Sequence, residues 1–121
     1  MGRARVVARM IEHPGVEDVS VQQVLEALAD PARRKVVHTL AHAASPLSCG
    51  SFDLPVGRST SSHHFTVLRQ AGLVRQYYIG TTKMNALRSE ELERRFPGLL
   101  SAVVAAADAE AHQGGGAARG T

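Results

Sequence analysis

The chain has 121 residues, of which 14 are Lys or Arg and 11 are Asp or Glu, so its formal charge is +3. This length predicts one domain with its own core, and the 44% of apolar residues exclude a wholly disordered chain. One cysteine, Cys49, excludes an internal disulfide and a thiolate-rich metal site within one chain. No segment has the pattern of a signal peptide or a membrane span, so we expect a cytoplasmic protein with no membrane partner.

The first half of the chain predicts helices with clear start signals. Residues 3–12 have the pattern of a short helix, which a His-Pro-Gly sequence ends. Ser20 is a suitable N-cap for a helix with an apolar face, and Asp30 followed by Pro31 predicts the start of the next helix. One helical turn is expected over residues 48–52.

The second half predicts a helix that leads directly into a hairpin. Residues 59–71 have helical periodicity, and Gly72 is placed to end the helix. Residues 73–79 and 83–88 have the composition of two strands, joined by a turn at Gly80. The predicted fold class is therefore mainly α with a two-stranded wing.

Two more helices are expected after the hairpin. The first begins at Ser89 with acidic residues in its first turn, and the second is alanine-rich. Glycines predict a disordered tail over residues 114–121. The predicted organisation is a partly disordered N-terminal arm over 1–19, one domain over 20–113, and this tail.

The basic residues are concentrated in the middle of the chain. No acidic residue lies between Leu54 and Ser89, and the basic residues of this segment are Arg58, Arg69, Arg75, Lys83 and Arg88. A surface of one sign suits a phosphate backbone, and a solvated basic face is the alternative. A basic helix followed by a basic hairpin is the plan of a winged helix-turn-helix domain.

The helix over residues 59–71 has one polar, acid-free face. At about 100° per residue, Phe65 and Leu68 point to the domain. The outer side is formed by Ser59, Thr60, His63, Thr66, Val67 and Gln70. These side chains can reach base edges, and Arg58 and Arg69 flank them as candidate phosphate contacts. An ordinary surface helix with serine caps is the alternative.

Two motifs resemble those of ArsR/SmtB-type bacterial transcriptional regulators. ALADPARRKVV (residues 27–37) is similar to the opening helix pair of the family, and SHHFTVLRQAGLV (residues 62–74) is similar to its recognition helix and the exit into the wing. The resemblance implies a winged helix-turn-helix homodimer that pairs through its first and last helices and binds an imperfect palindrome of double-stranded DNA.

The resemblance also implies the DNA contacts. They are Ser59, Thr60, Ser62, His63 and Thr66 on the helix, with Arg75 and Lys83 at the wing. His64 lies at the edge of this face, where a phosphate contact and a structural hydrogen bond are both open.

Many members of this family respond to metal ions, and the lone cysteine leaves histidine and carboxylate as ligands. Asp108 and His112 are four residues apart in the last helix, and Glu12 with His13 could complete a nickel or zinc site. The polar end of an amphipathic helix is the alternative. His38 and His42 share this spacing, but no carboxylate accompanies them within their helix, so a solvated face is expected there.

The remaining alternatives concern the class of protein. The sequence contains no nucleophile elbow, phosphate-binding loop or zinc-protease motif, so we expect no enzymatic activity. A winged helix that binds only protein would carry an apolar patch in place of its polar outer face. An organic ligand or a partner protein remains the alternative to a metal effector.

Overall fold

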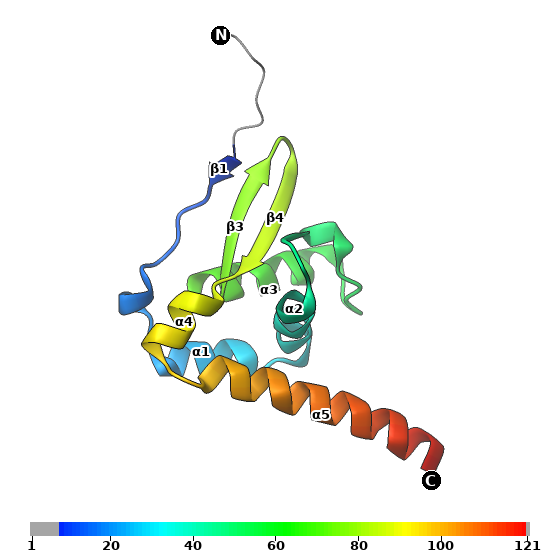
Figure 1. Cartoon of the computed structure of the whole chain (residues 1–121). Coiled ribbons are helices and arrows are strands. Elements are labelled where there is room, and N and C mark those ends of the chain that lie inside the picture. The colour runs from blue at the N-terminus through cyan, green and yellow to red at the C-terminus, as the bar shows by residue number, and fades with distance from the viewer. Residues whose placement is uncertain (1–7, 121) are drawn as a thin grey trace.

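The computed structural model describes residues 8–120, with side chains described over residues 9–113. In chain order, its elements are β1 (Ala8–Met10), the 3₁₀ turn η1 (Val16–Asp18), α1 (Val21–Leu28), α2 (Pro31–His42), β2 (Leu47–Ser48), the 3₁₀ turn η2 (Cys49–Ser51), α3 (Arg58–Gln70), β3 (Val74–Ile79), β4 (Thr82–Leu87), α4 (Ser89–Arg95) and α5 (Leu99–Gly120). The hairpin β3–β4 projects from a helical body, and α5 runs along the base of that body (Figure 1). Among the described residues, no helix is both long and apolar enough to cross a membrane.

The predicted helix starts are confirmed by their caps. The Ser20 hydroxyl accepts a hydrogen bond from the Gln23 N–H, and the Gln23 side chain accepts one from the Ser20 N–H. The Asp30 carboxylate accepts from the Ala32 N–H at 2.8 Å, and Pro31 occupies the first helical position, where no N–H is needed. Local sequence therefore determines where α1 and α2 begin.

The wing belongs to a larger sheet than the sequence predicts. The strand order is β1-β3-β4-β2, so two short strands flank the expected hairpin. The predicted helix over residues 3–12 is wrong where it is described, because residues 8–10 pair antiparallel with β3; residues 3–7 lie outside the described part of the chain. β1 has three residues and β2 has two, which is too short for an alternating pattern to be visible in the sequence. Both strands form only because they pair with the hairpin.

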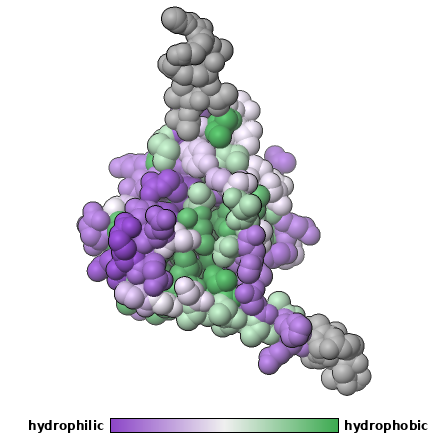
Figure 2. Space-filling view, viewed as in Figure 1, coloured by the Kyte–Doolittle hydropathy of each residue, from purple (hydrophilic) through white to green (hydrophobic). Residues whose placement is uncertain are grey.

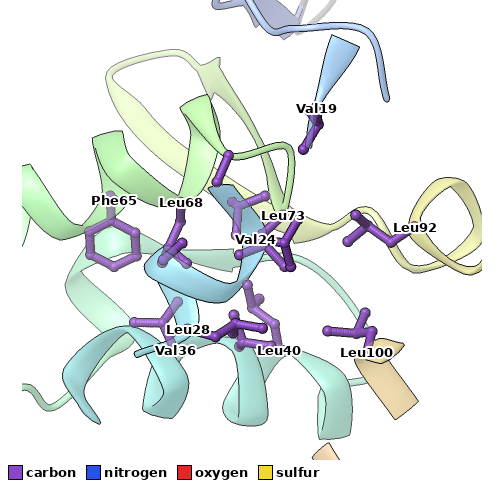
Figure 3. Close-up of a cluster of buried hydrophobic side chains, with 14 residues drawn as sticks. Val19, Val24, Leu28, Val36, Leu40, Phe65, Leu68, Leu73, Leu92 and Leu100 are labelled. Carbon is purple, nitrogen blue, oxygen red and sulfur yellow. The ribbon is translucent and has the colours of Figure 1, made fainter. Parts of the chain in front are cut away.

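Fourteen apolar residues form one core shared by α1, α2, α3, the hairpin, α4 and α5 (Figure 3). Val19, which precedes α1, is 1% exposed and belongs to this core. Gly72 has a φ of +78°, and a Cβ there would lie 2.7 Å from a Val19 methyl group. Val19 therefore packs in the core of the domain, although it precedes residue 20, where the sequence predicts the domain to begin.

The last helix is longer than the sequence predicts. α5 continues to Gly120 through the glycine-rich segment that composition assigns to a disordered tail. Each residue added to an existing helix gains one backbone hydrogen bond, whereas only nucleation is costly. The packed start of α5 thus supplies a nucleus on which the weak helix formers can propagate.

Candidate nucleic-acid interface

Helix α3 presents the polar face that the sequence predicts. Its buried side carries Phe65 and Leu68, which are 2% and 0% exposed. The side chains exposed to solvent include those of Arg58, Ser59, Thr60, Ser62, His63 and Gln70. Thr66 is half-buried, and Val67, which was expected to point outward, is half-buried against the core. The exposed face is thus concentrated in the first two turns of α3.

The start of α3 faces the wing across a hollow. Arg58 and Ser62 line one side of this hollow, and Tyr78 and Lys83 line the other. Gly57 caps the helix, and the first N–H to reach it is that of Ser61. The N–H groups of residues 58–60 therefore have no partner within the helix. Free N–H groups beside two basic side chains form a suitable environment for a phosphate group.

The wing carries a basic residue that sequence reasoning missed. β1 pairs with β3 so that Arg9 lies opposite Tyr78. The Arg9 guanidinium lies 4.9 Å from the centre of the Tyr78 ring, and the Lys83 ammonium lies 5.8 Å from it. Both distances are within the range of cation–π attraction. The two valines at residues 6 and 7 are the strand-forming residues that precede Arg9 in the sequence.

Three basic residues of the acid-free segment bind the protein itself. Arg69 donates to the carbonyl of Glu12, and Arg88, which is 5% exposed, donates to the carbonyl of Pro14. Arg75 lies 2.7 Å from the Glu91 carboxylate, to which Arg88 also donates. These hydrogen bonds, above all those from Arg88, lower the pKa of Glu91 to about 2.

The sequence correctly predicts a basic surface, but it assigns too many basic residues to that surface. Within the described residues, Arg58 and Lys83 form no ion pair, whereas Arg69 and Arg88 hold the N-terminal arm against the domain. Sequence distance concealed this role, because the carbonyls that these arginines bind lie 57 and 74 residues away.

His64 is a structural residue. It is 6% exposed, and its Nδ1 lies 3.2 Å from an Arg33 guanidinium nitrogen, while its Nε2 lies 3.9 Å from the Asp30 carboxylate. Of the two roles left open by the sequence, the structural hydrogen bond is the one observed. The His64 ring is held against the start of α2, so little of it is accessible to DNA.

A buried polar cluster joins α3 to the wing. Gln76 and Asn85, which are both 0% exposed, face each other on β3 and β4, and the Gln76 amide donates to Asn85 Oδ1 at 2.8 Å. Gln76 Oε1 accepts from Arg69 Nε, and the Asn85 amide donates to the Leu47 carbonyl and to the Cys49 sulfur. Satisfied buried groups of this kind specify one arrangement of their elements.

The metal ligands expected from sequence are not brought together within one chain. His13 accepts the Gln76 N–H at its Nε2, with 2.8 Å between the two nitrogens. Burial, together with the charges of Arg75, Arg88 and Arg69, lowers the pKa of this histidine. Its hydrogen bond places His13 at β3, whereas Asp108 is placed against α2 by the packing of α5.

Asp108 meets two other histidines. Its Oδ1 lies 2.5 Å from His38 Nε2 and 2.9 Å from His42 Nε2. These hydrogen bonds, first the one from His38, lower the pKa of the Asp108 carboxyl. As the sequence indicates, α2 contains no carboxylate, and the two histidines are partly exposed to solvent. What the sequence did not show is that α5 supplies a carboxylate partner from 70 residues away.

Comparison with known proteins shows the family. Residues 28–77 match a helix-turn-helix domain family. The chain is 37% identical over 101 residues to the HTH-type transcriptional regulator Rv2034 of Mycobacterium tuberculosis (strain ATCC 25618 / H37Rv), with 75% of this chain and 92% of that protein covered. It is 34% identical over 80 residues to the HTH-type transcriptional regulator YceK of Bacillus subtilis (strain 168), with 64% and 80% covered.

A solved structure has the same fold. The ArsR-like transcriptional regulator from Rhodococcus sp. RHA1 is similar with a TM-score of 0.53 and 23% sequence identity, over 82% of this chain and 89% of that chain. The chain therefore belongs to the helix-turn-helix transcriptional regulators and has the winged fold of the ArsR-like type.

Proposed function

We propose that this regulator binds a specific palindromic operator as a homodimer in the cytoplasm. The observation that carries the proposal is the acid-free polar face of α3 beside a wing that holds Arg9 and Lys83. An α-helix fits the major groove of B-DNA, where each base pair presents a distinct pattern of donors and acceptors. Regulators of this family are DNA-binding proteins rather than enzymes, in agreement with the expectation from sequence.

The exposed residues divide into two roles. Ser59, Thr60, Ser62 and His63 would read base edges or bind phosphates from α3, with Thr66 at the margin of this set. Arg58 and Lys83 would bind phosphates on either side of the hollow, and these contacts would set the position of α3 in the groove. Arg69 and Arg75 remain candidates for phosphate contacts, but the bonds they make within the protein weaken their case.

Dimerisation through α1 and α5 accounts for apolar surface that one chain leaves uncovered. Val21 and Leu25 on α1 are both 46% exposed, and Ala102, Ala105, Ala106 and Ala109 on α5 are exposed. Small side chains let two helices approach closely. A two-fold axis through this surface would present two copies of α3 to DNA, and the operator would share that symmetry.

The effector would act away from the DNA-binding surface. A divalent metal, nickel or zinc, held by histidine and carboxylate is the effector that we propose. An organic ligand is the alternative effector. The observation that supports this alternative is a hollow between α2, α4 and α5, whose apolar lining includes Ala41, Leu87, Leu100 and Val104. Apolar residues gather at the centre of the corresponding face in Figure 2.

A salt titration tests DNA binding. The preferred sequence is first selected from a randomised duplex pool, and its affinity is then measured by fluorescence anisotropy at increasing salt concentration. Arg58→Ala and Lys83→Ala should each make the negative slope of log affinity against log salt shallower by about 0.9. Arg94→Ala is the matched control, because Arg94 is an exposed arginine on α4. No binding, or binding that salt does not weaken, would refute the proposal.

Sedimentation tests the dimer. Leu25→Glu places a charge at a position that is already half open in the single chain, so the fold should survive. The variant should sediment as a monomer, retain its circular dichroism spectrum and lose affinity for the operator. An unchanged dimer would exclude this part of α1 from the interface.

A further inference from the structure

The packing of α5 on α2 creates a cluster of metal-binding side chains. His38 and His42 are one turn apart on α2, and Asp108 comes from α5. One ligand atom from each residue lies within 4.8 Å of the other two. Both imidazole Nε2 atoms converge on the same carboxylate oxygen.

From this convergence we propose that His38, His42 and Asp108 bind one divalent zinc, nickel or cobalt ion. Two imidazoles and a carboxylate suit these borderline metals, whereas magnesium and calcium prefer oxygen ligands alone. A central ion would lie about 2 Å from each ligand atom, and the three atoms already lie within 4.8 Å of one another. Water would occupy the remaining coordination position.

The surroundings allow a cation to enter. The side chains of His38, His42 and Asp108 are 30%, 55% and 47% exposed, so entry needs no opening of the fold. The two basic neighbours on α2 are directed elsewhere. Arg34 donates to the carbonyls of Leu28 and Ala29, and Lys35 donates to the carbonyl of Asp53.

Hydrogen bonding alone explains the short distances among His38, His42 and Asp108, but it does not explain why two histidines share one carboxylate oxygen. One neutral histidine would suffice to pair with Asp108, and a second imidazole on the same oxygen adds little in water. Two histidines at this spacing and a carboxylate from a second element form a chelate, in which each ligand raises the effective concentration of the next. A bound ion would therefore fasten α5 to α2 near the end of their contact.

The consequence for regulation rests on the proposed function. α2 packs against α3, and α5 is part of the proposed dimer surface. An ion that joins α2 to α5 would fix the recognition helix relative to the dimer axis. It would thereby change the separation of the two recognition helices and the affinity for DNA.

Cobalt binding tests the site without reference to DNA. The full chain, without a histidine tag, is titrated with Co²⁺ and the visible absorption is recorded; Zn²⁺ is then added as a competitor. We expect one Co²⁺ per chain, displaced by Zn²⁺. His42→Ala and Asp108→Asn should each weaken Co²⁺ binding by about tenfold or more. Thermal unfolding in the presence of a chelator confirms that each variant folds.

His112→Ala is the matched control, because His112 is an exposed histidine one turn beyond Asp108 on the same helix. Unchanged Co²⁺ affinity in this variant supports the cluster. Three results would each overturn the proposal. The first is that the natural chain binds no Co²⁺, and the second is that the His42→Ala and Asp108→Asn variants bind Co²⁺ as tightly as the natural chain does. The third is that the His112→Ala and His13→Ala variants lose Co²⁺ binding.

Operator affinity with and without Zn²⁺ then tests regulation. If the chain binds metal but its operator affinity does not change, the metal site is supported and its effect on DNA binding is refuted. Metal binding by a chain that binds no DNA under any condition would refute the proposed function while supporting the site.

Discussion

Glu91 offers a quantitative test of the ion cluster at the start of α4. Its carboxylate accepts hydrogen bonds from Arg88 and Arg75 at 2.7 Å each. Arg88 has a side chain that is only 3% exposed, so its charge depends on this partner. Glu91→Gln keeps the size of the side chain but removes the charge, and leaves a buried guanidinium without compensation.

The expected loss follows from the pKa. Lowering the pKa of Glu91 from its ordinary value of 4.5 to about 2 corresponds to about 3 kcal/mol. The Glu91 side chain is 29% exposed, and solvent screening reduces the free energy, so we expect Glu91→Gln to lower the free energy of unfolding by about 2 kcal/mol at pH 7.

Acid should reduce this difference. The pKa of Glu91 is lower in the folded state, so the stabilisation is complete above pH 4.5 and is lost as the pH falls towards 2. Urea unfolding followed by circular dichroism, at one protein concentration, should give the full difference at pH 7 and about 40% less at pH 3.5.

The control variant is Glu90→Gln, in the same first turn but exposed. It loses only the interaction with the helix dipole, about 0.5 kcal/mol. Equal effects of the two substitutions, or a Glu91→Gln effect that does not change with pH, would refute the role assigned to the cluster.

Two further predictions concern the arm and the wing. The pKa of His13 is lowered in the folded state, so the stability linked to it is complete above pH 6.5 and is lost as the pH falls below this value; His13→Gln should reduce the fall in melting temperature between pH 7 and pH 5.5, and an unchanged pH profile would contradict this. Asn85→Leu leaves the Leu47 carbonyl and the Gln76 amide without their partner, so the free energy of unfolding should fall by about 2 kcal/mol or more and operator affinity should fall with it; a stable variant with full affinity would show that the buried cluster does not position the wing.

Much of the fold could be predicted because its signals are local. The caps at Ser20 and Asp30, the positive φ of Gly72 and Gly80, and the strand composition of the hairpin segments each depend on neighbouring residues. The same holds for the polar face of α3, because helical periodicity alone separates Phe65 and Leu68 from the exposed side chains. The family motifs also lie within single segments.

Only the tertiary structure decided which polar residues face solvent and which face each other. His63 and His64 are adjacent in sequence, yet His63 is exposed and His64 is enclosed by α2. Arg69 and Arg88 are arginines of the same acid-free segment as Arg58. Unlike Arg58, they donate hydrogen bonds to backbone carbonyls of the N-terminal arm, which lies far from them in sequence.

The histidine and aspartate cluster is the clearest case. The spacing of His38 and His42 is visible in the sequence, but their carboxylate partner arrives through the packing of α5. The crossing of two helices is set by the apolar side chains between them, such as Leu40 and Leu100, and not by the polar groups that the crossing brings together. The sequence by itself therefore determined the main helices, the hairpin and the polar face of α3, whereas long-range packing determined the two flanking strands, which basic side chains remain free of partners within the described residues, and where histidine and carboxylate ligands meet.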